Sequence, residues 1–168
     1  IFHAGQGCAV QSRLLVPKSR YEEARAIMTA AYAGLGDGWG DISNPDHIMG
    51  PVVSKRQMDR VLSYIELGKQ EGATLVAGGK ARPDKGGGYF IEPTLFANVS
   101  NDSRIAREEI FGPVLCLIPC EDEADAIRIA NDSDFGLNGS VLTHDANAAY
   151  RIARQVRDLR AARRLSLE

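Results

Sequence analysis

A cysteine set among small residues is the feature of this sequence with the clearest chemical potential. Cys8 follows Gly5, Gln6 and Gly7 and precedes Ala9. The two glycines leave the backbone free to bend, so the thiol is expected at a loop tip. Small neighbours let a carbonyl carbon approach the sulfur beside backbone N–H groups that can hold an oxyanion. A thiolate is a strong nucleophile toward aldehydes. These residues alone leave two interpretations open: a catalytic nucleophile, or a buried structural cysteine.

Other residues with reactive side chains give weaker signals. His3 lies five residues before Cys8, and a Cys–His pair would indicate a hydrolase-like site, but spacing within a loop does not fix a distance. Cys116 and Cys120 have Cys-x-x-x-Cys spacing without a histidine cluster, so we expect core packing and no metal site. Three cysteines, an odd number without a Cys-x-x-Cys pair, favour reduced thiols in a cytoplasmic protein.

Composition excludes several classes of protein. The chain has 168 residues, of which 44% are hydrophobic and 25% charged, with a formal net charge of -2. These values are typical of one soluble globular domain. The charge balance gives no reason to expect nucleic acid or an acidic membrane as a partner. The sequence contains no apolar stretch of the length that spans a bilayer, and its first residues do not resemble a secretory signal.

Hydrophobic spacing alternates between strand-like and helix-like segments. The expected strands are residues 12–16, 74–77, 114–118 and 140–143, with a further extended stretch over 89–99. The expected helices are residues 21–33, 54–72, 103–108, 123–131 and 146–156, the first two capped by Ser19 and Ser54. Such alternation predicts an α/β domain with an open, mainly parallel sheet flanked by helices.

The C-terminal residues break this pattern. Residues 157–168 are rich in arginine and show no strand spacing, although a strand should follow a helix here in an α/β domain. We therefore expect a domain over residues 1–156 and an Arg-rich tail that is not part of the fold. The other interpretation of the tail is a genuine basic arm.

Four blocks of sequence carry a resemblance to a known family. Residues 2–8, Phe-His-Ala-Gly-Gln-Gly-Cys, resemble the active-site cysteine signature of the aldehyde dehydrogenase superfamily. About a hundred residues later, Glu-Glu-Ile-Phe-Gly-Pro-Val at 108–114 is similar to its second hallmark. Residues 49–72 and 92–96 are similar to family blocks in the same order. His3 is a departure, because the family often has asparagine there.

The resemblance implies a mechanism and a set of site residues. Cys8 would attack an aldehyde to give a thiohemiacetal, which passes hydride to the nicotinamide of NAD or NADP and leaves a thioester for hydrolysis. Glu109 would bind the nicotinamide ribose, and Phe111 would pack beside the nicotinamide. Gln57 and Arg60 match positions that approach the cofactor.

The resemblance also implies that parts of the family's machinery precede this sequence. The general-base glutamate, the oxyanion asparagine and the dinucleotide loop lie upstream of the cysteine signature, and further catalytic-domain segments follow position 156. We therefore expect a truncated fold, little or no dehydrogenase turnover by the isolated chain, and a parent protein that forms a homo-oligomer. Two alternatives stay open: a CoA-acylating semialdehyde dehydrogenase, and a non-catalytic remnant acting as an interaction module. The aldehyde, and the choice between NAD and NADP, are not determined by these residues.

Overall fold

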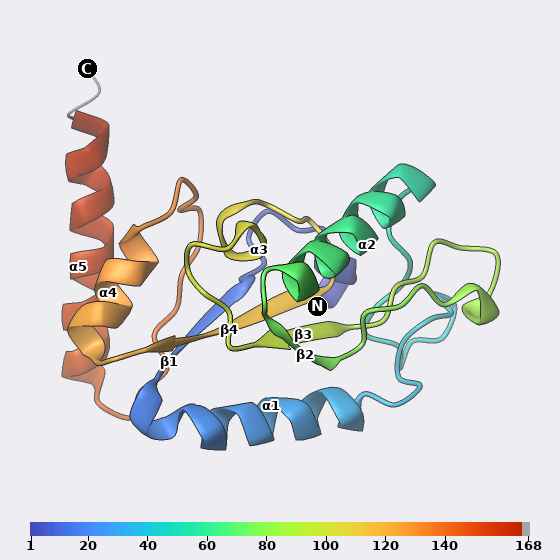
Figure 1. Ribbon diagram of the computed structural model, residues 1–168, viewed down its shortest axis with the longest axis horizontal. Coiled ribbons are helices and arrows are strands. Elements are labelled where there is room, and N and C mark those ends of the chain that lie inside the picture. The colour runs from blue at the N-terminus through green and yellow to red at the C-terminus, as the bar shows by residue number, and fades with distance from the viewer. Residues whose placement is uncertain (166–168) are drawn as a thin grey trace.

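A four-stranded sheet carries the helices of this chain (Figure 1). The computed structural model describes the backbone of residues 1–165 and the side chains of residues 1–156. The strands are β1 (Arg13–Pro17), β2 (Thr74–Ala77), β3 (Thr94–Ala97) and β4 (Val114–Cys120). The α-helices are α1 (Tyr21–Gly34), α2 (Lys55–Gln70), α3 (Arg104–Arg107), α4 (Glu123–Asn131) and α5 (Ala146–Leu165). Short 3₁₀ turns cover Phe2–Gly5, Lys18–Arg20 and Pro83–Lys85.

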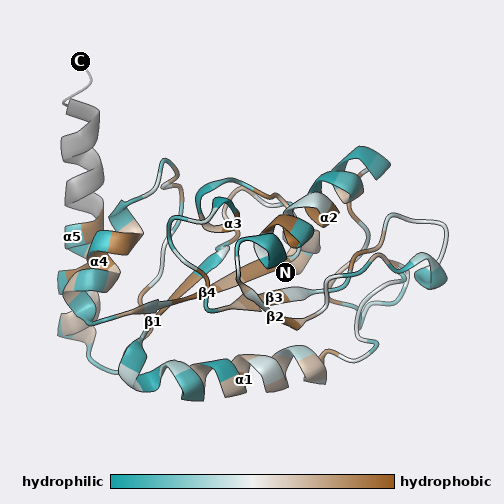
Figure 2. Ribbon diagram, viewed as in Figure 1, coloured by the Kyte–Doolittle hydropathy of each residue, from teal (hydrophilic) through white to brown (hydrophobic). Residues whose placement is uncertain are grey.

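The strand order is β1-β4-β3-β2, which confirms the predicted mainly parallel sheet. Strand β4 pairs in parallel with both β1 and β3, and only β2 joins its neighbour in the antiparallel sense. The β4 sequence Val-Leu-Cys-Leu-Ile-Pro-Cys is apolar along its whole length, as expected for a parallel strand covered on both faces. In Figure 2 this strand is largely in the hydrophobic colour.

Helices cover both faces of the sheet, with α1 on one side and α2 on the other (Figure 1). Val61 and Ile65 of α2 are fully buried and pack in one core cluster with Phe96 of β3. Tyr21 of α1 packs on the opposite face with Leu117 of β4. Successive side chains of a strand point to opposite faces, so the strands are buried on both sides.

The two cysteines of β4 are core residues, as the sequence predicts. Cys116 and Cys120 are each 1% exposed and belong to the cluster on the α2 side of the sheet. Burial raises the pKa of the Cys116 thiol to about 12 and also raises the pKa of the Cys120 thiol. Both thiols are therefore protonated at neutral pH and shielded from reagents.

The first four predicted helices agree with the structure within two residues at their ends. Ser54 caps α2, because the Gln57 N–H donates to the Ser54 Oγ at 3.2 Å. The predicted cap at Ser19 is wrong. Residues 18–20 form a 3₁₀ turn between β1 and α1, and no side chain caps α1. The helix begins at Tyr21, so Arg20 occupies the capping position and Ser19 lies one residue before it.

The predicted strand over residues 140–143 is also wrong. This segment makes no ladder with the sheet, and Leu142 is 87% exposed. Ser140 of this segment and Asn138 just before it contact residues 9–11 through their side chains rather than through a backbone ladder. The backbone pairing that defines a strand is therefore missing from these described residues.

Helix α5 is longer than predicted, because it continues beyond residue 156 to Leu165. The side chains of residues 157–168 and the backbone of 166–168 lie outside the described residues. The assignment of 157–168 as a tail outside the fold therefore stays a prediction. None of the helices in the described part of the chain has the length and apolar character needed to cross a bilayer.

Candidate active site

Cys8 lies at the tip of a hydrogen-bonded turn. The Val10 N–H donates to the Gly7 carbonyl at 2.9 Å, which places Cys8 and Ala9 at the two central positions. The Cys8 thiol is exposed and free. Within the described residues, the Cys8 N–H has no hydrogen-bond acceptor, so it can donate to an incoming oxygen. In the same residues no hydrogen bond joins the exposed His3 ring to Cys8, which gives the Cys–His hypothesis no support.

Sheet topology brings the cysteine turn to the loop that precedes β4. The Cys8 turn leads into β1, and residues 109–113 lead into β4. Because β1 and β4 are parallel neighbours, both loops enter the sheet at the same edge. Segments about a hundred positions apart in the sequence thus meet in space.

Two glycines let these loops touch. Gly5 has a φ of +68°, and a Cβ at this position would lie 1.9 Å from the Gly112 carbonyl oxygen. A Cβ on Gly112 would in turn lie 2.4 Å from a methyl group of Val61 on α2. A side chain at position 5 would displace backbone, and one at position 112 would displace the Val61 side chain. Three segments, the cysteine turn, the β4 entry loop and α2, are therefore in direct contact.

Gln6 ties the entry side of the cysteine turn to the start of α2. The backbone N–H of Val53 donates to Gln6 Oε1 at 3.0 Å. The glutamine between the two glycines of the cysteine motif thus bonds to the segment that leads into the helix carrying Gln57 and Arg60. The sequence did not indicate this role.

Side chains of α2 hold three successive carbonyls of the β4 entry loop. Gln57 Nε2 donates to the Phe111 carbonyl at 2.7 Å and to the Ile110 carbonyl at 3.1 Å. Arg60 Nη2 donates to the Glu109 carbonyl at 2.7 Å. Phe111 has a φ of +58°, a strained value for a bulky residue. The two donors on α2 stabilise this backbone and fix the direction of the Glu109 and Phe111 side chains.

The two adjacent glutamates of this loop differ in their surroundings. Glu108 bonds to Arg104 through both oxygens and accepts from the Tyr64 hydroxyl at 2.5 Å. Its hydrogen bond with Arg104, and then that with Tyr64, lowers the pKa of the Glu108 carboxyl to about 2. Glu109 is exposed, and its carboxylate makes no hydrogen bond or ion pair within the described residues. Glu108 is thus structural, and Glu109 is available to a ligand.

We expect Glu108→Gln to change how stability depends on pH. A depressed carboxyl pKa stabilises the fold above the unfolded-state value of 4.5, and this contribution is lost as pH falls toward about 2. The Glu108 side chain is 38% exposed, so the variant should be less stable by up to about 1 kcal/mol near neutral pH. Urea unfolding at a series of pH values measures the difference, which should shrink below pH 4.5. Glu66→Gln, another surface acid, is the control, and a pH-independent gap would contradict the assignment.

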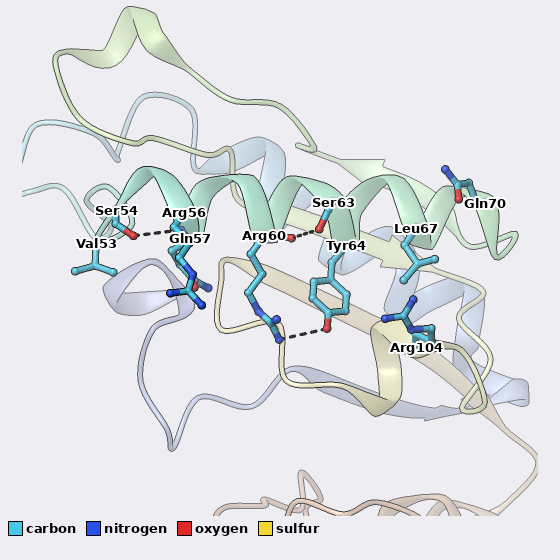
Figure 3. A pocket seen from close by; sticks show the side chains of 10 residues that line it. All are labelled: Val53, Ser54, Arg56, Gln57, Arg60, Ser63, Tyr64, Leu67, Gln70 and Arg104. Carbon is cyan, nitrogen blue, oxygen red and sulfur yellow. Dashed lines mark hydrogen bonds between the residues drawn. The ribbon is translucent and has the colours of Figure 1, made fainter.

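A groove of about 810 Å³ lies along the side of α2 that faces α3 (Figure 3). Its lining includes Gln57 and Arg60 and two more arginines, Arg56 and Arg104, and contains no carboxylate. Arg60 lies over the Tyr64 ring with its Cζ 4.9 Å from the ring centroid. Arg104 is paired with Glu108, whereas Arg56 and Arg60 form no ion pair with a carboxylate within the described residues. The groove is thus polar and positively charged, which suits an anionic ligand. It does not reach Cys8.

The predicted site residues lie on segments that contact one another, and two of them, Gln57 and Arg60, also bond to the loop backbone. Glu109 and Phe111 lie on the loop that touches the cysteine turn, and Gln57 and Arg60 hold that loop by its backbone. The sequence analysis did not predict that Gly112 contacts Gly5. Its place in the Phe-Gly-Pro motif was the available signal, since a glycine between bulky residues often marks close backbone approach.

The fold is that of an α/β protein in which the loops with the candidate site residues enter neighbouring parallel strands at one edge of the sheet. The chain belongs to the aldehyde dehydrogenase family, because the model of that family matches residues 1–159. This match confirms the family that the sequence motifs predicted.

Known proteins of this family are similar over almost the whole chain. A geranial dehydrogenase of Castellaniella defragrans is 42% identical over 156 residues, which are 93% of this chain and 32% of that protein. An aldehyde dehydrogenase of Mycobacterium tuberculosis, solved with NAD+, is 50% identical with a TM-score of 0.85, over 92% of this chain and 32% of the other. Aldehyde dehydrogenase C of Pseudomonas syringae, a cysteine-to-alanine mutant solved with NAD+ and octanal, is 36% identical with a TM-score of 0.86, again over 92% and 32%. The chain thus spans about a third of the length of these relatives.

Proposed function

We propose that this chain carries the nucleophile and part of the cofactor site of an enzyme that oxidises an aldehyde to a carboxylic acid with NAD or NADP. The observation that carries the proposal is the contact between the Cys8 turn and the 109–112 loop through Gly5 and Gly112. This contact sets an exposed thiol beside a loop with a free carboxylate. Relatives solved with NAD+, one of them also with octanal, support the same assignment.

Cys8 is the proposed nucleophile. Its sulfur adds to the aldehyde carbon, the C=O π bond breaks, and the thiol proton ends on the oxygen as a thiohemiacetal. The free Cys8 N–H donates to that oxygen while it carries negative charge. Transfer of the carbon-bound hydrogen as hydride to NAD or NADP, with loss of the hydroxyl proton to solvent, would leave a thioester on the sulfur. Water would then add to the thioester carbon, the carbon–sulfur bond would break, and the acid and the Cys8 thiol would be released. A small side chain at Ala9 leaves room for the aldehyde on this side of the turn.

The cofactor residues are proposed on the chemistry of their free atoms. NAD or NADP, when bound, supplies the nicotinamide that accepts the hydride. The Glu109 carboxylate can accept hydrogen bonds from ribose hydroxyls, and the Phe111 ring can pack against an aromatic ring. Gln57 uses its amide nitrogen on the loop backbone, which leaves its oxygen for a ribose hydroxyl. Arg60 uses Nη2 on the loop and retains other donors for the ligand.

We further propose that these 168 residues alone form the adduct without turnover, because the relatives are about three times as long. To test this, the chain is mixed with an aldehyde labelled with ¹³C at its carbonyl, with and without NAD+, and the ¹³C NMR spectrum and the absorbance of NADH are followed. We expect a thiohemiacetal signal that Cys8→Ser abolishes, and no increase in absorbance from NADH. A missing adduct would contradict the nucleophile, and NADH formation would contradict the inactivity of the isolated chain.

A further inference from the structure

We propose that Asn138 is a positioning residue for Cys8, an inference that rests on the proposed function. Asn138 Nδ2 donates to the Ala9 carbonyl at 2.8 Å, although 129 positions separate the two residues. Two residues further, Ser140 Oγ donates to Gln11 Oε1, also at 2.8 Å. The segment between α4 and α5 thus bonds twice to the chain directly after the proposed nucleophile.

Asn138 acts on the exit side of the cysteine turn. The Ala9 carbonyl belongs to the peptide that joins Ala9 to Val10, and the Val10 N–H closes the turn on Gly7. Gln6 holds the entry side of the same turn through Val53. Gln6 therefore anchors the chain before Cys8 through its own side chain, and Asn138 holds the peptide after Cys8 by its carbonyl. On the entry side, Gly7 would otherwise allow the backbone wide freedom.

The segment that carries Asn138 is itself tethered. At its start, Arg107 donates to both carboxylate oxygens of Asp132, at 2.6 Å and 3.1 Å. At its end, Arg151 of α5 forms an ion pair with Glu123 of α4. These contacts hold the ends of the connection in place, so Asn138 is presented to Ala9 by a restrained segment rather than by a free loop.

The orientation of the cysteine turn and the exposure of the Cys8 thiol affect two reactions of this thiol differently. Aldehyde addition needs the sulfur and the Cys8 N–H oriented together, because the oxygen that receives the charge must face the donor. Alkylation by iodoacetamide forms a sulfur–carbon bond and expels iodide, and it needs only an exposed thiolate. Loss of the Asn138 bond leaves Cys8 exposed but lets the turn rotate. Aldehyde affinity should therefore fall while alkylation stays constant.

The experiment uses the 168-residue chain with Asn138→Ala and Asn138→Asp, the second of which replaces the donor by an oxygen of almost the same shape. The control is Asn147→Ala, an exposed asparagine whose side chain makes no hydrogen bond within the described residues. For ¹³C-labelled propanal we expect the dissociation constant of the Cys8 adduct to rise roughly threefold in both variants. The rate of iodoacetamide alkylation at Cys8 should stay within a factor of about 1.5 of the rate in the unmodified chain, because this reaction needs only an exposed thiolate.

Hydrogen exchange at the Val10 amide tests the inference independently of any aldehyde adduct. Both Asn138 variants should exchange this amide roughly threefold faster than the parent chain and the control. Unchanged exchange at the Val10 amide would overturn the positioning role. Equal changes in the alkylation rate and in aldehyde affinity would also overturn it, because they would show that Asn138 affects the exposure of the Cys8 thiol. If the unmodified chain forms no adduct, the proposed function fails, and Val10 exchange still decides the role of Asn138.

Discussion

Gly5→Ala lowers the free energy of unfolding by about 2–5 kcal/mol if the two loops meet as described. The added methyl group would lie 1.9 Å from the Gly112 carbonyl oxygen, at a backbone φ of +68°. A left-handed conformation costs a residue with a side chain about 1–2 kcal/mol, and overpacking adds about 1–3 kcal/mol. Because the obstructing atom is backbone, rotation of a side chain cannot relieve the clash.

Urea unfolding followed through the single tryptophan measures this effect. Trp39 is 4% exposed, with Lys85 Nζ 4.9 Å from its ring centroid, so its emission should change on unfolding. The matched control is Gly87→Ala, because a Cβ there would meet no atom within 4 Å. Equal stability of the two variants would show that the cysteine turn and the β4 entry loop are not in contact.

Cys8→Ser is expected to abolish acylation of the chain by an activated ester such as p-nitrophenyl acetate. The thiolate attacks the ester carbonyl, the bond to p-nitrophenolate breaks, and an acetyl thioester remains on sulfur. A serine hydroxyl without an adjacent base is a far weaker nucleophile, so the rate should fall by about a hundredfold or more. Cys120→Ala is the control, since this thiol is 1% exposed and burial raises its pKa.

Much of the fold could be predicted because its signals are local. The all-apolar stretch that forms β4 indicated a buried strand, and Ser54 before an amphipathic segment indicated the start of α2. The segment over 140–143 misled for the same reason. Its apolar and β-branched residues are typical of a strand. A strand exists, however, only when another backbone lies within hydrogen-bonding distance, which the residue types do not reveal.

The site residues could be predicted as a set, whereas their mutual contacts could not. Cys8 and Glu109 were found by local motifs and a family resemblance. The bond from Gln57 to the Phe111 carbonyl joins residues 54 positions apart, and that from Asn138 to Ala9 joins residues 129 apart. Such contacts depend on the order of strands in the sheet, and one sequence does not specify that order.

The most direct test of the central claim, that Cys8 is the nucleophile of this chain, is the p-nitrophenyl acetate burst combined with peptide mass spectrometry. We expect release of about one p-nitrophenolate per chain followed by almost no steady-state rate, because no group of the isolated chain is proposed to activate water for deacylation. The acetyl group should be found on Cys8, and not on Cys116 or Cys120. A burst that persists in Cys8→Ser, or an acetyl group located on another residue, would contradict the claim.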